Sequence, residues 1–299
     1  MIFSDRDLPA GFAARAGRDE EWATWVDGVP RTVRDLVAEW ELTIDGSPMH
    51  GRTALVVPVT VGGRAAVLKI AGPDERGRHE ILALQTWHGH GAVALLRGDP
   101  RRRAMLLDRL HPRDLTTTPV LEACEIVAAL YAQLHVPAPP QLVPLTCLVE
   151  GWSDDLERLP RDAPVPRRIV EQAVHLGRSF VSDAASTGRL VHTDLHYENV
   201  LAAGDDAWLA IDPEPVSGDP HYEIAPLLWN RWPEVVATGD VRSAVRRRFH
   251  TVVDAAGLDE DRARDWVVVR LTHHAMWAIE DGDRDDLTAA IAIVKAVQD

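Results

Sequence analysis

The feature that most constrains the fold of this 299-residue chain is one segment, VHTDLHYENVLAAGDDAWLAIDPEP, at residues 191–215. It contains His192 and Asp194, then Asn199, and then Asp212 beyond two short apolar stretches, VLAA and AWLAI, that flank a GDD turn. Apolar stretches on either side of a turn are typical of a β-hairpin. A hairpin folds back on itself, so it would return Asp212 to the neighbourhood of Asn199.

The side chains of Asp194, Asn199 and Asp212 suit one kind of chemistry. Phosphoryl transfer needs a carboxylate that orients an acceptor hydroxyl and takes its proton, together with oxygen ligands for Mg²⁺. Asp194 fits the first role, and Asn199 and Asp212 carry the hard oxygen donors that Mg²⁺ prefers. An ordinary loop followed by a hairpin would explain any one of these residues alone. Their combined spacing favours a kinase active site.

A second constellation lies earlier in the chain. Lys69 ends a β-type run, AAVLK, and Glu80 follows on a helical stretch. A helix carboxylate can hold the flexible lysine stem, so that the lysine neutralises nucleotide phosphates. The alternative is a strand-end lysine and a solvated glutamate, but lysine is rare here, occurring elsewhere only at 295. Glu75 is a weaker partner, because it lies too near the helix start.

Two further nucleotide contacts are weaker predictions. The turn SPMHGRTA contains Gly51, which would let backbone N–H groups approach phosphate oxygens, although a plain hairpin turn explains it nearly as well. The run MLLDRL is placed to connect two lobes, so the backbone of Asp108 and Leu110 could bind adenine.

The apolar periodicity changes about a third of the way along the chain. Early segments favour strands around one amphipathic helix at 74–88, and Gly28-Val29-Pro30 suggests that the segment 19–40 is broken into a helix, a turn and a second element. Later segments favour helices. The expected strands are 40–44, 53–61, 64–70, 91–99 and 103–110, and the expected later helices are 121–135, 152–159, 166–186, 221–236, 239–256, 259–281 and 283–297. We therefore expect an α+β protein with an N-terminal nucleotide-binding lobe, 1–112, and a helical catalytic lobe, 113–299.

Composition limits the partners. The net charge of −14 disfavours nucleic acid and anionic membranes and favours a cationic small molecule. Cys124 and Cys147 lack metal-ligand spacing, so we expect two buried free thiols in a reducing cytoplasm. The start MIFSDRDLPAG lacks the apolar run of a signal peptide, and no stretch is long enough to span a membrane. The expected protein is cytoplasmic and soluble, with a monomer favoured.

The motifs above resemble the aminoglycoside/hydroxyurea antibiotic resistance kinase family, which includes streptomycin 6-phosphotransferases. The similarity is carried by MHGRTALVVPV, AVLKI, HTDLHYENVL, IDPEPVSGDPHYEIAPLLWNRW and MWAIEDG. It implies a bilobal protein-kinase-like fold with ATP and Mg²⁺ bound between the lobes, Asp194 as base, and an aminoglycoside such as streptomycin as acceptor. Such kinases often have glycine where this chain has Thr193 and Glu198, a difference that bears on loop geometry and the acceptor.

The same resemblance suggests substrate contacts near the end of the chain. Trp277, Glu280 and Asp281 offer an aromatic face and carboxylates to a guanidinium or ammonium group. The sequence favours two interpretations of Glu223 equally, an acid in the first turn of a helix and a residue of the substrate pocket. Asp219 is expected to cap a helix and to hold the catalytic-loop backbone. Two rivals remain: a metabolite kinase of the same fold, acting on choline or a sugar amine, and a pseudokinase that binds nucleotide without turnover.

Overall fold

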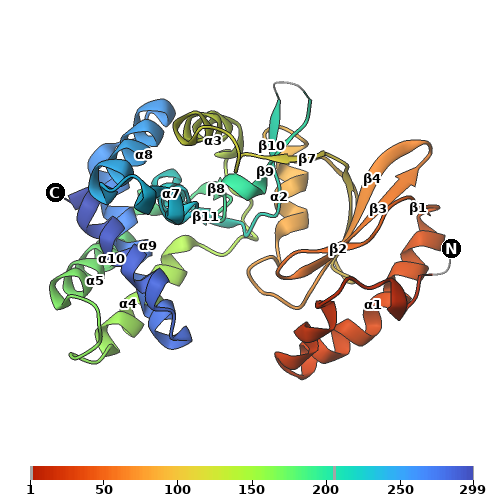
Figure 1. Ribbon diagram of the computed structural model, residues 1–299, viewed down its shortest axis with the longest axis horizontal. Helices are drawn as coiled ribbons and strands as arrows, with labels where there is room; N and C mark the ends of the chain where they lie inside the picture. The colour runs from red at the N-terminus through yellow and green to blue at the C-terminus, as the bar shows by residue number, and fades with distance from the viewer. Residues whose placement is uncertain (1–2, 205–206, 299) are drawn as a thin grey trace. The chain divides into compact units, whose positions relative to one another are not determined.

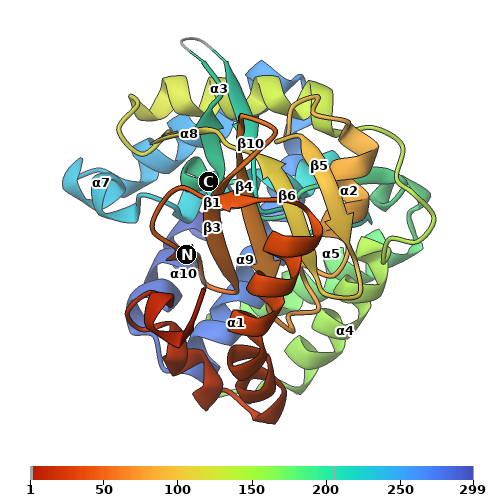
Figure 2. The same cartoon turned by 90° about the vertical axis from the view of Figure 1, so that its right-hand side faces the viewer.

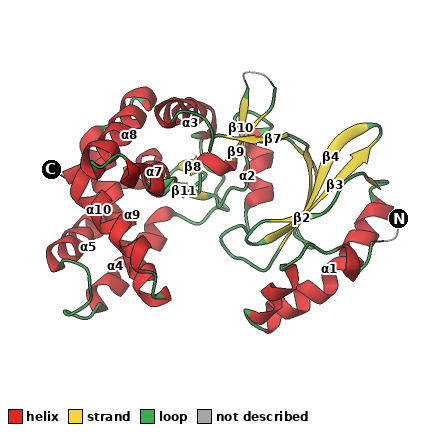
Figure 3. Cartoon of the chain, viewed as in Figure 1, coloured by secondary structure: helices red, strands yellow, loops and turns green. Residues whose placement is uncertain are grey.

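The computed structural model describes residues 3–204 and 207–298. Its chain divides into two compact units, Met1–His111 and Pro112–Asp299. Strands are concentrated in the first unit and helices in the second (Figure 3). The predicted fold class, a small antiparallel sheet followed by a larger helical part, is confirmed.

The first unit is built on a six-stranded antiparallel sheet with the order β1-β3-β4-β6-β5, in which β2 also pairs with β3. The hairpin between β3 and β4 closes through Gly62 and Gly63, both with positive φ, as a tight two-residue turn requires. The strands are β1 (Thr43–Ile44), β2 (Met49–His50), β3 (Ala54–Val61), β4 (Arg64–Ala71), β5 (Leu95–Asp99) and β6 (Ala104–Asp108).

One long helix, α1 (Glu20–Glu39), covers a face of this sheet (Figure 2). The predicted break at Gly28-Val29-Pro30 is wrong, because Pro30 lies inside the continuous helix. Val29, Val33 and Leu36 are buried against the strands, and this packing outweighs the lost backbone hydrogen bond. Two short 3₁₀ segments precede α1, namely η1 (Asp5–Asp7) and η2 (Phe12–Gly17).

Helix α2 (Glu80–Trp87) begins six residues later than the predicted start at 74. The Asp74 side chain accepts from the backbone N–H of Arg76, a local turn that competes with the helix. As a result Glu80 occupies the first helical position.

The second unit consists mainly of helices and also contains two small sheets (Figure 1). One sheet has the order β10-β9-β7 and the other pairs β11 with β8. Its long helices are α3 (Val120–Leu134), α4 (Leu145–Arg158), α5 (Arg167–Ser182), α8 (Val241–Ala256), α9 (Glu260–Asp281) and α10 (Arg284–Gln298). Its strands and 3₁₀ segments are β7 (His111–Asp114), β8 (Arg189–Val191), β9 (Val200–Ala202), β10 (Trp208–Ala210), β11 (Val216–Gly218), η3 (Ala184–Ser186) and η4 (Tyr197–Asn199).

Two predicted helices differ from the structure. Helix α4 starts at Leu145 rather than 152, directly after Pro144 at its N-cap. The predicted helix 221–236 is divided into η5 (Pro220–Ile224), α6 (Ala225–Trp229) and α7 (Trp232–Ala237). The break falls at Arg231, which has φ +56°, and the buried Arg248 donates to the carbonyls of residues 227, 230 and 231 there.

Both cysteines are free thiols, as expected, but only Cys124 is buried. The expectation for Cys147 is wrong, because it lies on the outer side of α4 and is exposed. Of the helices described, none combines the length and apolarity needed to cross a bilayer.

Candidate active site

The predicted hairpin after Asn199 is confirmed in strands β9 and β10. Val200 pairs with Ala210, and the Ile211 N–H donates to the Asn199 carbonyl at 2.9 Å. This pairing brings the residue before Asp212 next to Asn199, as the sequence predicts. Of the GDD turn, Asp205 and Asp206 lie outside the described residues.

Asn199 is bonded directly to Asp194. Its amide Nδ2 donates to the Asp194 carbonyl at 2.8 Å and reaches the carboxylate Oδ2 at 3.3 Å. The Oδ1 oxygen, which takes no part in these bonds, is the atom that could ligate a cation. The Asp194 side chain is 37% exposed, so its carboxylate can meet a substrate hydroxyl.

His192 is buried between the loop that carries Asp194 and the strand that leads into Asp212. Its Nε2 lies 2.9 Å from the Ile211 carbonyl, which can only accept, so Nε2 carries the proton and Nδ1 accepts from the Asp194 N–H at 3.3 Å. Burial lowers the pKa of His192 below 6.5, in keeping with a neutral ring. His192 therefore ties the loop carrying Asp194 to the strand that leads into Asp212.

Thr193 has a left-handed backbone, with φ +65°. This conformation is strained for a β-branched residue. Three hydrogen bonds hold it: the N–H donates to Glu223 Oε1 at 2.6 Å, Oγ1 donates to the Glu214 carbonyl at 2.6 Å, and the carbonyl accepts from Arg270. The position where related kinases often have glycine thus keeps a glycine-like conformation.

The structure corrects the prediction of Glu223 as a substrate contact. The side chain is 0% exposed, and its second oxygen accepts from His135 Nε2 at 2.8 Å. Burial alone would raise the pKa of Glu223, but the hydrogen bonds from His135 and from the Thr193 N–H lower it below 4.5. Glu223 is therefore a buried carboxylate that holds the loop carrying Asp194 through the Thr193 N–H.

Asp219 caps η5, as predicted, by accepting from the His221 N–H at 3.0 Å. Its other oxygen accepts from Arg262 Nε at 2.6 Å and from Trp266 Nε1 at 2.7 Å. These bonds tie Asp219 to α9. The loop-holding role expected for Asp219 belongs to Glu223.

The first unit contains the predicted pair of Lys69 and Glu80. Lys69 Nζ lies 2.6 Å from Glu80 Oε1, and the two residues are only 6% and 3% exposed. Glu75 instead pairs with Arg78 at 3.2 Å and is 73% exposed. A buried ion pair of this kind presents the ammonium group in a restricted position.

The weaker nucleotide predictions stay predictions. Gly51 has an ordinary φ, and a Cβ there would meet nothing within 4 Å, so the backbone does not require glycine. Its carbonyl accepts from Arg15, which holds this turn against η2. The Asp108 carboxylate pairs with Arg64 at 2.7 Å, and the Asp108 backbone N–H donates to the Ala94 carbonyl. Leu110 lies in the connector after β6.

The predicted substrate residues on α9 lie at the surface. Trp277 is 43% exposed, and its ring meets His273 at 4.2 Å and Trp152 at 6.4 Å. Glu280 and Asp281 are exposed in the last turn of the same helix. Burial lowers the pKa of His273 to about 3, so its ring is neutral at pH 7 and does not repel a cation at Trp277.

The sequence did not predict three residues that support the site: Arg270, His135 and Trp152. Each acts on residues far away in the chain, such as Arg270 on the Thr193 carbonyl and His135 on Glu223. Local spacing carries no signal for such contacts. The one hint available was the polar face of the helical segment 259–281.

Comparisons with solved structures identify the fold. A thermostable mutant of aminoglycoside phosphotransferase APH(4)-Ia, in ternary complex with ADP and hygromycin B, matches with a TM-score of 0.59 at 18% identity. The match covers 88% of this chain and 97% of that chain. The fold is therefore that of the protein-kinase-like phosphotransferases.

The sequence narrows the class to a family. Residues 39–282 match the family described as aminoglycoside/hydroxyurea antibiotic resistance kinase. The chain is 39% identical to streptomycin 6-kinase of Streptomyces glaucescens, over 98% of this chain and 97% of that protein. It is 37% identical to hydroxyurea phosphotransferase of Kitasatospora aureofaciens, over 91% of this chain and 78% of that protein. The chain belongs to the aminoglycoside/hydroxyurea antibiotic resistance kinase family, as the motifs suggested.

The role of Glu223 predicts a pH-dependent stability difference. Glu223→Gln should destabilise the protein by about 1–3 kcal/mol at pH 7, because a neutral amide replaces a carboxylate in two buried hydrogen bonds. Since the folded-state pKa of Glu223 is lowered, the carboxylate stabilises above the unfolded pKa of about 4.5 and loses this effect as the pH falls through the folded value. Thermal unfolding of both proteins from pH 7 to pH 3.5 measures the difference.

The gap in Tm between the wild type and Glu223→Gln should narrow below about pH 4.5. Glu150→Gln, on the exposed side of α4, is the matched control and should leave Tm nearly unchanged. A gap that stays constant across this pH range would contradict the role given to the Glu223 carboxylate.

Proposed function

We propose that the protein transfers the γ-phosphate of ATP to a hydroxyl of an aminoglycoside, with streptomycin as the leading candidate, and that it acts as a resistance enzyme. The observation that carries this proposal is the bonded arrangement of Asp194 and Asn199 at the base of the hairpin that leads to Asp212. Family membership and the likeness to a streptomycin 6-kinase support the acceptor class.

In this proposal Asp194 is the base. An acceptor hydroxyl hydrogen-bonds to its half-exposed carboxylate, the hydroxyl oxygen attacks the γ-phosphorus, and the bond from phosphorus to the β,γ-bridging oxygen breaks. The hydroxyl proton passes to Asp194. Asn199 keeps the carboxylate oriented, and the Glu223–Thr193 bond keeps the backbone under it in place.

Lys69 supplies positive charge to the nucleotide phosphates. Its pairing with the buried Glu80 restricts an otherwise flexible stem, so little conformational entropy is lost when the phosphates bind. We assign Gly51, Asp108 and Leu110 to the surroundings of the nucleotide. The N–H groups of Gly51 and Asp108 donate to the carbonyls of Ala54 and Ala94, so these two residues are not assigned as backbone donors.

Asn199 and Asp212 are suitable ligands for Mg²⁺. One amide oxygen and one carboxylate are hard donors, and Mg²⁺ commonly combines one or two such ligands with phosphate oxygens and waters. Mg²⁺ would neutralise charge on the phosphates.

Substrate recognition is assigned to the end of α9. Trp277 presents a partly exposed ring, and Glu280 and Asp281 add negative charge beside it. A guanidinium group can stack on such a ring and pair with a carboxylate. The net charge of −14 would also raise the local concentration of a cationic antibiotic. Because the phosphate donor is ATP, we place the reaction in the cytoplasm.

The direct test is to incubate the purified protein with Mg-ATP and a panel of acceptors, following ADP release and acceptor mass. The panel holds streptomycin, hygromycin B, hydroxyurea and choline. Phosphorylated streptomycin supports the proposal. A gain of phosphate by hydroxyurea or choline alone would replace the aminoglycoside with another acceptor, and ATP binding without any transfer would indicate a pseudokinase.

The base assignment predicts a specific loss. Asp194→Ala should lower kcat by about a thousandfold or more, because general-base and orienting effects are lost together. Nucleotide affinity, measured by calorimetry, should change little. A folded variant that transfers phosphate at the wild-type rate would exclude Asp194 as the base.

The substrate assignment predicts a selective effect on binding. Trp277→Ala should raise KM for streptomycin by roughly 5- to 30-fold with a small change in kcat, since a cation–π contact of about 1–2 kcal/mol is removed from ground and transition states alike. Trp277→Phe should recover part of the affinity. Leu148→Ala, which removes an exposed apolar side chain on α4, is the control. Unchanged KM values for Trp277→Ala would argue against this surface.

A further inference from the structure

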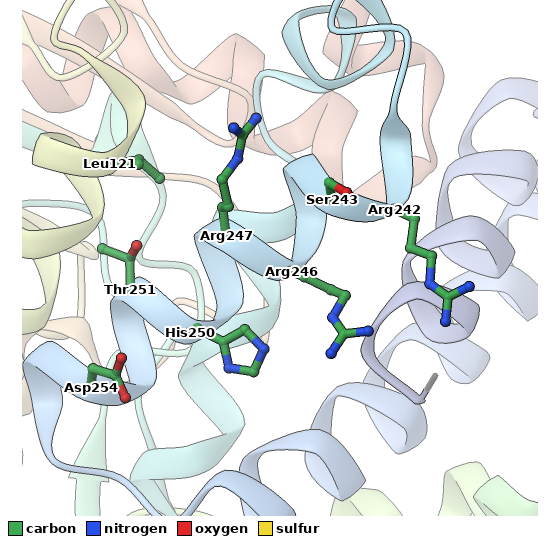
Figure 4. Close-up of a pocket in the computed structure, with 8 residues that line it drawn as sticks. All are labelled: Leu121, Arg242, Ser243, Arg246, Arg247, His250, Thr251 and Asp254. Carbon is green, nitrogen blue, oxygen red and sulfur yellow. The ribbon is translucent and has the colours of Figure 1, made fainter.

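A groove rich in arginine lies on the outer side of α8, apart from every residue assigned above. It has a volume of about 470 Å³ and is lined by Arg242, Arg246, Arg247 and His250 (Figure 4). Leu121, from the first turn of α3, forms its apolar wall. Helices α3 and α8 lie side by side, so both walls belong to the same unit (Figure 1).

The basic residues recur at helical spacing. Arg242, Arg246 and His250 are each four residues apart and follow one another along one side of α8 (Figure 4). Four residues of helix rise by about 6 Å, so basic side chains repeat at that interval along the groove. Like charges at this spacing repel each other and destabilise a helix, unless an anion lies between them.

The charge of the groove contrasts with the rest of the chain. The lining holds three arginines and one carboxylate, Asp254, whereas the whole chain has 46 acidic and 32 basic residues. Just outside the lining, the Asp240 carboxylate attracts Arg242 and Arg247, and Glu260 lies 3.9 Å from His250, so Arg246 is the groove arginine on which the argument depends. Elsewhere arginines often contact two carboxylates, as Arg102 does with Glu39 and Asp99, and Arg178 with Asp154 and Glu157.

Arg246 is the most informative of these side chains. It is half-buried, yet among residues 3–204 and 207–298 it makes neither a hydrogen bond nor an ion pair. A guanidinium group has five N–H donors in a planar fork that matches a phosphate or carboxylate. A partly desolvated arginine without a protein partner is a group prepared for an external anion.

We propose that this groove binds a small anion that carries two or three linked phosphate groups. Several guanidinium groups in a row favour several adjacent charges over one, and the limited volume favours a small molecule. The net charge of −14 disfavours a long polyanion such as nucleic acid. Leu121 offers an apolar contact beside the charges, so the ligand is either an inorganic polyphosphate or a nucleoside polyphosphate. The proposal is independent of the phosphotransferase function.

The test measures binding of sodium tripolyphosphate and of ADP to the full-length protein by calorimetry, without Mg²⁺, at low and at physiological salt. Arg246→Glu combined with Arg247→Glu should weaken tripolyphosphate binding by at least tenfold. Arg161→Glu combined with Arg168→Glu, at two exposed positions outside the groove, changes the net charge equally and should leave affinity within about twofold. Thermal unfolding and kinase activity, both expected to be unchanged, verify that the variants fold.

Lys69→Ala separates the groove from the nucleotide site, because it removes a phosphate contact only from the latter. Tripolyphosphate should still bind to Lys69→Ala and should lose that affinity when the two groove arginines are also replaced. Tighter binding of ADP than of tripolyphosphate in the Lys69→Ala background would identify a nucleotide ligand, and the reverse an inorganic one. Equal affinities for the groove and control variants, or loss of all binding in Lys69→Ala, would overturn the proposal. If the double glutamate variant does not fold, Arg246→Gln is measured under the same criteria.

Discussion

The hydrogen bond from the Thr193 N–H to the buried Glu223 carboxylate is the interaction on which the catalytic unit depends. It crosses from the loop carrying Asp194 to η5, at 2.6 Å, and both partners are shielded from water. Because a buried carboxylate without partners is costly, Glu223 enforces a loop conformation that delivers an N–H to it. That conformation is left-handed at Thr193 and sets the direction in which the next side chain, Asp194, leaves the backbone.

The remaining contacts extend this constraint outward. His192 links the loop to Ile211, and Arg270 binds the Thr193 carbonyl from α9. Three separate elements thus hold one short loop, so the carboxylate needs little reorganisation when a substrate arrives. The first unit uses the same principle on a smaller scale, since the buried Glu80 restricts Lys69. In both units a buried acid fixes the position of a charged group that the proposed reaction uses, Asp194 for the acceptor hydroxyl and Lys69 for the phosphates.

The sequence predicted what depends on local spacing. The hairpin after Asn199 and the Lys69–Glu80 pair follow from turn signals and from the distance between a strand and the next helix. Prediction from the sequence failed where tertiary packing decides the conformation or the role of a residue. Burial of its apolar face keeps α1 continuous through Pro30, although a proline normally interrupts a helix. Glu223 looks like a first-turn acid in the sequence, and only the folded chain shows it beneath the catalytic loop.

The central claim is that the left-handed backbone at Thr193 positions Asp194, and that the Thr193 hydroxyl matters only because its bond to the Glu214 carbonyl holds this strained backbone. The most direct measurement is kcat for Thr193→Gly beside Thr193→Val, since both lose the bond to the Glu214 carbonyl but only glycine accepts φ +65° without strain. The account predicts that the glycine variant stays within about threefold of the wild type, while the valine variant falls by about tenfold or more, as a strain of roughly 1–3 kcal/mol implies. Equal losses of kcat in the two variants would contradict it.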